Sequence, residues 1–156
     1  MSSRSRAALD AEMGLAMRRF MANVVVFQDA VAKSAGLNSV DLQCVGLLML
    51  DGPSTPSELA RRTGLGSGGA ITAVIDRLEA AGLVRRVRDA ADRRRVLVTP
   101  EVEELRRRVA PAYERVGAEW GAYLATLDDD QVAFLTAAFQ RATAINRDEV
   151  AALREV

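Results

Sequence analysis

A chain of 156 residues is long enough for one domain with a substantial core, and a hydrophobic content of 49% argues against global disorder. Histidine is absent and Cys44 is the one cysteine, which excludes Cys/His zinc sites, histidine-based catalysis and an intrachain disulfide. We therefore expect no catalytic residues, no metal and no cofactor. The polar start MSSRSRA and the short apolar run 44–50 predict a cytoplasmic protein.

Charge is distributed unevenly along a chain whose net charge is zero. Residues 61–99 carry nine arginines against four acidic residues, a local net charge of +5. Residues 100–156 carry seven arginines against eleven acidic residues. A basic segment inside a neutral chain indicates a contact surface for nucleic acid.

A long helix is predicted over residues 7–35. Apolar residues follow one another along it at steps of four and three: Leu9, Met13, Met17, Phe20, Val24, Phe27 and Val31. A helix of this length extends about 40 Å, more than one small winged unit covers, so part of the stripe needs another partner. A second helix should begin at Asn38 or Ser39 and end at 51–53, with Leu42, Val45, Leu48 and Met49 inside.

Residues 55–82 predict a helix-turn-helix. The stretch Thr55-Pro56-Ser57-Glu58 is a capping box with proline at the first helical position, and Gly64 suits a left-handed C-terminal cap. Ser67 is the expected N-cap of the following helix. One buried face is predicted for that helix from four apolar residues at helical spacing: Ile71, Val74, Ile75 and Leu78.

A basic hairpin should follow, with strands Leu83–Arg88 and Arg95–Thr99 around a polar turn. A second long helix is expected to begin at Thr99-Pro100 and to kink near Pro111. A last helix should begin at 128–130. The simplest way to cover the apolar stripes of the terminal helices is to pack them against the same elements of a second copy.

Three segments, SELARRTGL, ITAVIDRLEAAGLVRR and DAADRRRVLVT, resemble in order and spacing the MarR family of winged helix-turn-helix transcription regulators. The resemblance implies a single domain over 1–156, mainly α with a small β-hairpin wing. Its DNA-binding lobe would span 38–99, between dimerisation helices at 7–35 and 100–156. It also implies a homodimer that binds a palindromic operator in double-stranded DNA, most often as a repressor released by a small ligand.

The candidate DNA contacts lie on the second helix of the motif and on the wing: Ser67, Gly68, Gly69, Thr72, Ala73, Arg77, Arg86, Arg88, Asp92, Arg93, Arg94 and Arg95. The helix begins with short side chains, so we expect modest base readout and a larger share from DNA shape. Thr72 either contacts a base or is plain helix surface. At 92–94 the resemblance implies that Asp92 braces an arginine that enters the minor groove.

Two further features have competing interpretations. Five side chains either line a pocket for a small aromatic or apolar ligand or belong to the core: Phe20, Met21, Val24, Leu47 and Trp120. Cys44 has no basic residue close in sequence, which favours an inert core thiol over a redox sensor. The alternative function is a small-molecule-binding protein whose winged unit no longer binds DNA, although the arginine-rich wing argues against it.

Overall fold

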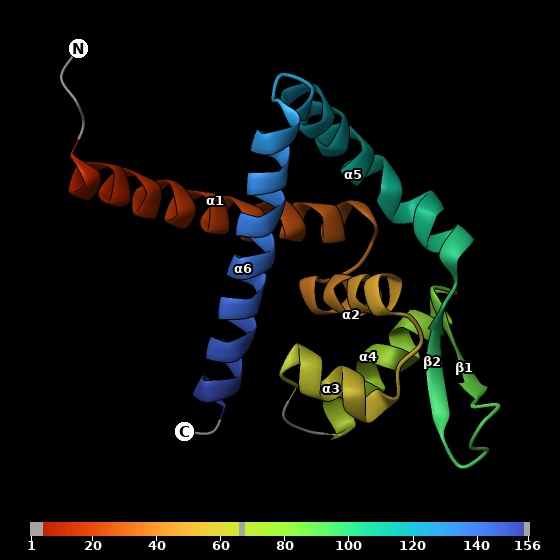
Figure 1. Cartoon of the computed structure of the whole chain (residues 1–156). Coiled ribbons are helices and arrows are strands. Elements are labelled where there is room, and N and C mark those ends of the chain that lie inside the picture. Colours follow the sequence, from red (N-terminus) through yellow and green to blue (C-terminus); the bar gives the residue numbers. More distant parts are fainter. Residues whose placement is uncertain (1–4, 66–67, 155–156) are drawn as a thin grey trace. The chain divides into compact units, whose positions relative to one another are not determined.

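The computed structural model describes residues 5–65 and 68–154, and these residues form a mainly α-helical fold with one two-stranded hairpin (Figure 1). The element order is α1-α2-α3-α4-β1-β2-α5-α6. The chain divides into two compact units, Met1–Ala112 and Tyr113–Val156, with the boundary inside α5. No helix in the described ranges is long and apolar enough to cross a membrane. The predicted fold class is confirmed, whereas the single-domain organisation stays a prediction.

Helix α1, Arg6–Ser34, begins at Ser5, whose hydroxyl accepts a hydrogen bond from the Ala8 N–H. Its last turns pack on α2, where Val31 and Ala32 are buried. The N-terminal part extends away from α2, α3 and α4 of the same unit (Figure 1). Its predicted apolar stripe is largely exposed within one chain, at Leu9, Met13, Met17, Phe20 and Val24.

Helix α2, Ser39–Asp51, is capped by Asn38, whose side chain accepts from the Asp41 N–H at 2.8 Å. Leu42, Val45 and Leu48 are buried as predicted. Met49 is 44% exposed, so its predicted inward position is wrong. The buried face of α2 also includes Asp41 and Cys44, which turns the helix so that Met49 lies at its edge.

The helix-turn-helix consists of α3, Pro56–Thr63, and α4, Gly68–Ala80. The predicted capping box forms: the Thr55 N–H donates to Glu58 at 2.7 Å, and the Glu58 N–H donates to the Thr55 hydroxyl at 3.3 Å. Gly64 adopts the left-handed conformation with φ 75°. The four predicted apolar residues of α4 are all buried, whereas the expected cap at Ser67 lies outside the described residues.

Strands β1, Val84–Arg88, and β2, Val96–Pro100, pair antiparallel, with Arg86 opposite Val98. Val98 also exchanges two backbone hydrogen bonds with Ser54, which attaches β2 to the segment before α3. The prediction that Thr99-Pro100 begins a helix is wrong, because both residues belong to β2 and α5 is Val102–Leu124. Pairing continues to Glu101, whose N–H donates to the Leu83 carbonyl, and this delays the helix.

The second unit contains the end of α5 and helix α6, Asp129–Leu153. Asp128 caps α6 through a second capping box, in which it and Gln131 exchange hydrogen bonds of 2.8 and 3.0 Å. No described residue of α6 is buried within one chain, although its apolar residues recur at helical spacing. Pro111 lies inside α5, and a kink there stays a prediction.

Candidate nucleic-acid interface

A closely packed core holds α3, α4 and the hairpin together. Its most deeply buried side chains come from all three elements: Leu59, Ile75, Leu78, Leu83 and Val98. Full burial of one such aliphatic side chain contributes about 1.5–3 kcal/mol to the free energy of folding. This cluster therefore stabilises the packing of α3, α4 and the hairpin. The opposite face of α4, with Thr72, Ala73 and Asp76, is exposed to solvent.

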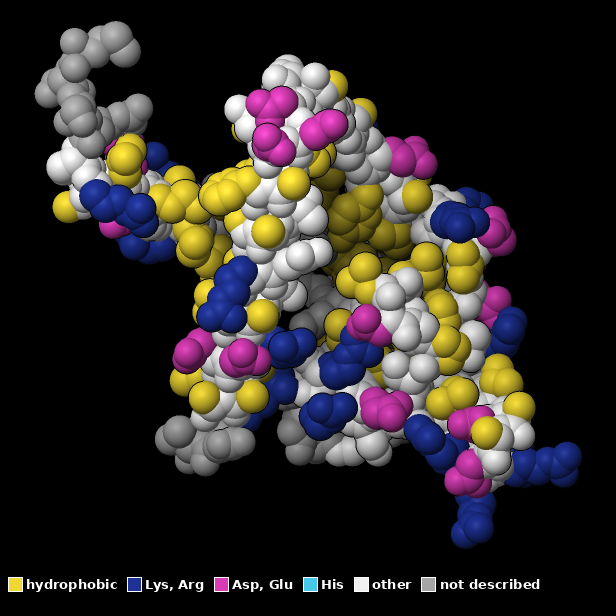
Figure 2. Space-filling model, viewed as in Figure 1, with side chains coloured by type: hydrophobic (Ala, Val, Ile, Leu, Met, Phe, Trp, Pro, Cys, Tyr) yellow, Lys and Arg dark blue, Asp and Glu magenta, His cyan; other side chains and the backbone are white. Residues whose placement is uncertain are grey.

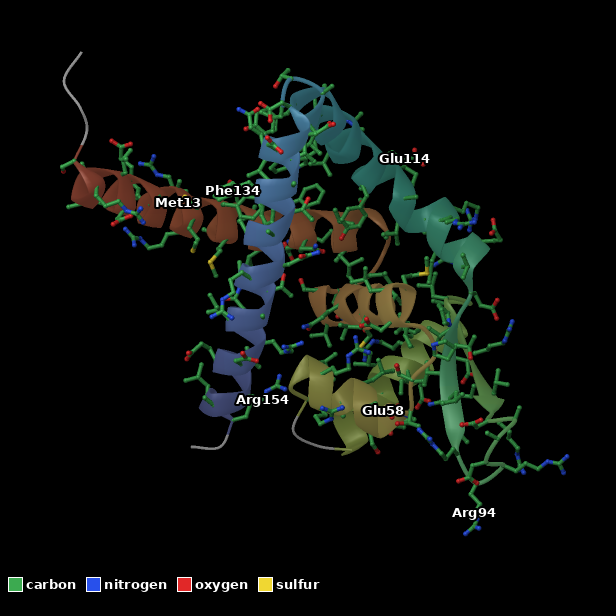
Figure 3. All side chains as sticks on the ribbon, in the orientation of Figure 1. Met13, Glu58, Arg94, Glu114, Phe134 and Arg154 are labelled. Carbon is green, nitrogen blue, oxygen red and sulfur yellow. The ribbon has the colours of Figure 1, made fainter. Side chains whose placement is uncertain are left out.

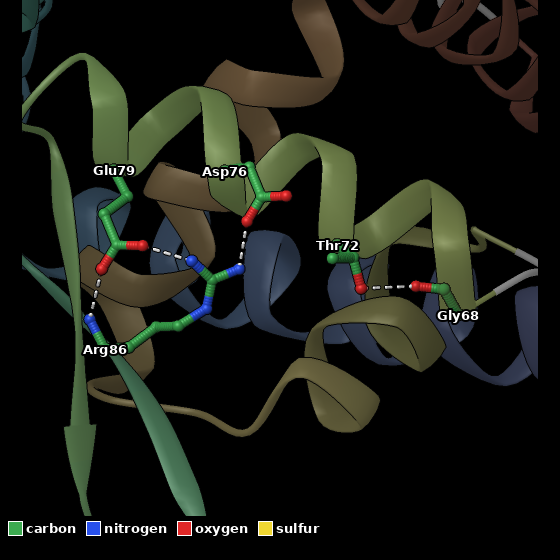
Figure 4. Close-up of polar contacts among 5 residues, drawn as sticks. All are labelled: Gly68, Thr72, Asp76, Glu79 and Arg86. Atoms are coloured by element: carbon green, nitrogen blue, oxygen red, sulfur yellow. Dashed lines mark hydrogen bonds and ion pairs between the residues drawn. The ribbon is translucent and has the colours of Figure 1, made fainter.

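The N-terminal part of α4 presents little side-chain chemistry. Gly68 and Gly69 are exposed, and a Cβ atom added at either would meet no atom within 4 Å. The Thr72 hydroxyl donates to the Gly68 carbonyl at 2.8 Å (Figure 4). Its proton is therefore engaged within the helix, and a base could use only the oxygen as an acceptor or the methyl group.

Arg77 lies on the exposed face of α4, as predicted, but its side chain reaches another helix. Its guanidinium donates to Asp41 of α2, with an Nη2–Oδ1 distance of 2.7 Å, and the Asp41 side chain is only 7% exposed. The bond to Asp41 raises the pKa of Arg77. Arg77 thus connects α4 to α2, and its predicted contact with DNA stays a prediction.

Arg86 also has internal partners. Its guanidinium lies 2.5 Å from Asp76 and pairs with Glu79, and its backbone N–H donates to Glu79 at 3.1 Å (Figure 4). Hydrogen bonding to Asp76, followed by that to Glu79, raises the pKa of Arg86 despite partial burial. Arg86, which was predicted to contact DNA, thus belongs to an ion-pair cluster between β1 and α4.

The turn of the wing is shaped by two aspartates. The Asp89 carboxylate accepts the Ala91 N–H at 2.8 Å, and the Asp92 carboxylate accepts the Arg94 N–H at 3.0 Å. The Asp92 carboxylate lies 4.0 Å from the Arg94 Nε, so its closer contact is with backbone. The Arg94 side chain is 97% exposed and points away from the hairpin tip (Figure 3). Its entry into a minor groove stays a prediction.

The five wing arginines therefore differ in their surroundings. Arg95 reaches Glu58 of the capping box at 3.3 Å, which connects the wing to α3 as Arg86 connects it to α4. The Glu58 pKa is lowered, first by the Thr55 N–H and then by the Thr55 hydroxyl. Arg88, Arg93 and Arg94 are exposed. Lys and Arg side chains project from this end of the hairpin in Figure 2 (dark blue, lower right).

The partners of these arginines were not predicted from sequence. Asp41 is 36 residues from Arg77, and Glu58 is 37 residues from Arg95. The sequence shows Asp76 and Glu79 three residues apart on the predicted helix, but no local pattern indicates that Arg86 pairs with them. Hydrophobic spacing places a side chain inside or outside, whereas ion pairing depends on which elements meet.

Cys44 is completely buried within α2. Burial, with a smaller effect from Asp41, raises the pKa of its thiol to about 11, while Arg77 acts in the opposite direction. Because the thiolate is the reactive form, these properties support an inert core thiol. Of the predicted pocket residues, Phe20, Met21 and Val24 are exposed, and Trp120 belongs to the second unit. The pocket therefore stays a prediction.

Comparison with known proteins finds a family match over the winged unit. The MarR family model matches residues 35–95, from the end of α1 to the wing turn. A protein of Bacillus subtilis (strain 168), YcgE, described as an uncharacterized HTH-type transcriptional regulator, is 43% identical over 101 residues. Residues 35–95 therefore match the MarR family. The aligned region covers 64% of this chain and 65% of the length of YcgE.

Solved structures extend the similarity to most of the chain. A MarR family protein from Bacillus stearothermophilus has a TM-score of 0.63 at 20% identity, covering 94% of this chain and 99% of that one. CouR from Rhodococcus jostii RHA1, solved bound to p-coumaroyl-CoA, has a TM-score of 0.59 at 27% identity, covering 87% and 94%. The long helices around the winged unit are therefore part of the MarR fold.

Proposed function

We propose that this protein is a sequence-specific DNA-binding transcription regulator. It binds a palindromic operator as a homodimer, represses transcription, and is released by a small-molecule ligand. The observation that supports DNA binding best is the exposed arginine group of the wing, Arg88, Arg93 and Arg94, beside a helix-turn-helix. The chain is neutral as a whole, so this local concentration of positive charge directs DNA to one surface.

In the proposed complex, the N-terminal part of α4 enters the major groove, and the wing reaches the adjacent minor groove. Gly68 and Gly69 let the backbone approach DNA closely, while Thr72 and Ala73 offer an acceptor oxygen and methyl groups to base edges. The arginines at the wing tip meet the negative potential of a narrow groove. Two copies related by a two-fold axis would read half-sites about 34 Å apart.

Release by a ligand is proposed from the relative CouR, whose structure was solved with p-coumaroyl-CoA bound. The exposed apolar and sulfur-containing side chains of α1, including Phe20, Met21 and Val24, are suitable material for an apolar or aromatic ligand. Such a ligand would act by favouring a dimer whose two α4 helices no longer match the half-site spacing.

DNA binding is tested by fluorescence anisotropy with a duplex from the region upstream of the gene. We expect Arg93→Ala with Arg94→Ala to weaken binding by about tenfold or more and to lower the slope of log affinity against log salt by up to about two, since each phosphate contact contributes about 0.9. The matched control is Arg6→Ala with Arg106→Ala, which removes the same charge from exposed positions outside the winged unit. Absence of binding at low salt, or equal losses for both pairs, would contradict the proposal.

A further inference from the structure

The ion-pair cluster of Arg86, Asp76 and Glu79 joins the two elements proposed to touch DNA. Arg86 lies in β1, and the two carboxylates lie one turn apart on α4 (Figure 4). The guanidinium binds both carboxylates, and Glu79 also accepts the Arg86 backbone N–H. Glu79 thus holds both the backbone and the side chain of one wing residue.

The position of Asp76 gives the cluster an electrostatic consequence. Asp76 follows Thr72 by four residues, so both lie on the same exposed face of α4. The carboxylate side chains are 61% and 39% exposed for Asp76 and Glu79. Two uncompensated carboxylates on this face would repel the phosphates of an approaching duplex.

Arg86 is the counter-charge for these carboxylates, and its surroundings differ from those of the open wing arginines. Side chains alternate along β1, so Arg86 shares a face with the buried Val84. The Arg86 side chain is 30% exposed, compared with 97% for Arg94. Moving its guanidinium to DNA would break the pairs with α4 and leave both carboxylates beside the phosphates.

We propose that Arg86 is a positioning residue that neutralises Asp76 and Glu79 and fixes the wing to α4, and that it does not contact DNA itself. The inference rests on the DNA-binding function proposed above and goes beyond it, because the residue acts through α4. With Arg86 in place the three side chains carry a net charge of −1. Without its side chain the two carboxylates carry −2, and the wing loses its ion pairs with α4 but keeps the backbone hydrogen bond from residue 86 to Glu79.

The test is a double-mutant cycle on binding of a short random-sequence duplex at low salt, because the electrostatic part of binding does not depend on sequence. Arg86→Ala should weaken binding about tenfold in the wild-type background and less than about twofold in the Asp76→Asn, Glu79→Gln background. Arg86→Lys, which keeps the charge, should remain within about threefold of wild type.

Arg88→Ala is the matched control, since Arg88 is an exposed arginine on the same strand. Its loss of affinity should be the same in both backgrounds, because a direct phosphate contact does not depend on the carboxylates of α4. If Arg86→Ala also shows equal losses in both backgrounds, Arg86 contacts DNA directly and the proposal is wrong. An unchanged affinity for Arg86→Ala would overturn it as well.

Amide hydrogen exchange of the free protein separates this inference from the proposed function. Arg86→Ala, and separately Asp76→Asn with Glu79→Gln, should accelerate exchange of the β1 and β2 amides, whereas Arg88→Ala should not. If wild type binds no duplex but exchange responds in this way, the DNA-binding function fails and the attachment of the wing stands. Unchanged exchange in the Arg86 and carboxylate variants would overturn the attachment.

Discussion

Arginine side chains of the winged unit have different roles in this chain. The role of each depends on whether a carboxylate of a neighbouring element pairs with its guanidinium group. Arg77 pairs with Asp41 and Arg86 with Asp76 and Glu79, so both guanidinium groups connect elements of the winged unit. Arg94 extends into solvent. The number of arginines in a basic segment therefore overestimates the charge available for DNA.

Arg77→Ala should lower the free energy of unfolding by about 1–2 kcal/mol, because it leaves the nearly buried Asp41 carboxylate without its guanidinium partner. The lower end of the range reflects the half-exposed Arg77 side chain, which water screens. Urea unfolding at constant m-value measures the change. Arg88→Ala, at an exposed position, should stay within about 0.5 kcal/mol of wild type. Equal unfolding midpoints for both variants would show that the pair contributes nothing.

At the scale of elements, hydrogen bonds from chain segments distant in sequence hold the helix-turn-helix of α3 and α4 in place. The capping box of Thr55 and Glu58 begins α3, and Glu58 also pairs with Arg95 of the wing. Ser54, just before this box, exchanges backbone hydrogen bonds with Val98 of β2. The start of α3 is therefore attached to the hairpin both by backbone pairing and by an ion pair.

Thr55→Ala should lower the free energy of unfolding by about 1 kcal/mol because the Glu58 N–H loses its acceptor. Thr55→Ser keeps the hydroxyl and should cost much less. Urea unfolding of both variants at neutral pH compares them. If Thr55→Ser is as unstable as Thr55→Ala, the threonine methyl group rather than the capping hydrogen bond is responsible.

Glu58 should also make stability depend on pH. Its folded pKa lies below the ordinary value of 4.5, so its contacts stabilise the fold above that pH and are lost as the pH falls through the lowered pKa. Wild type should therefore lose stability more steeply than Glu58→Gln below about pH 5. Urea midpoints measured across this range test the prediction, which parallel pH profiles would contradict.

For the whole molecule, the long terminal helices present apolar surface that one chain leaves uncovered. Leu9, Met13 and Met17 recur every four residues on α1 and are exposed, and α6 buries none of its described residues within one chain. Exposed apolar side chains at helical spacing are typical of a protein–protein interface. It supports the proposed homodimer, whose two copies of α4 would lie at a defined spacing.

Met13→Asp should shift the protein from dimer toward monomer, because it places a charge within the apolar stripe of α1. Sedimentation-velocity ultracentrifugation over a range of protein concentrations measures the change. Met49→Asp is the control, since Met49 is a comparably exposed methionine on α2, outside the stripe. A wild-type protein that is monomeric at all concentrations, or an equal effect of both substitutions, would rule out a dimer formed through this stripe.

The sequence by itself determined the elements whose causes are local. Caps at Asn38, Thr55 and Asp128 mark helix starts, and the apolar spacing of α4 predicted its buried face, because both depend on residues within a few positions. The wing was also readable, since alternation and a polar turn are local features. These signals were sufficient to predict the winged helix-turn-helix and to indicate its basic surface.

Only the tertiary structure decided which side chains on that surface are available. The partner of Arg77 lies 36 residues away, and the start of α5 was delayed by strand pairing between Leu83 and Glu101. Contacts of this kind arise when distant elements meet, and no spacing along the chain specifies them. The physical reason is that burial of a side chain follows the residue spacing within one helix or strand. Ion pairs and the ends of paired strands depend instead on contacts between two elements.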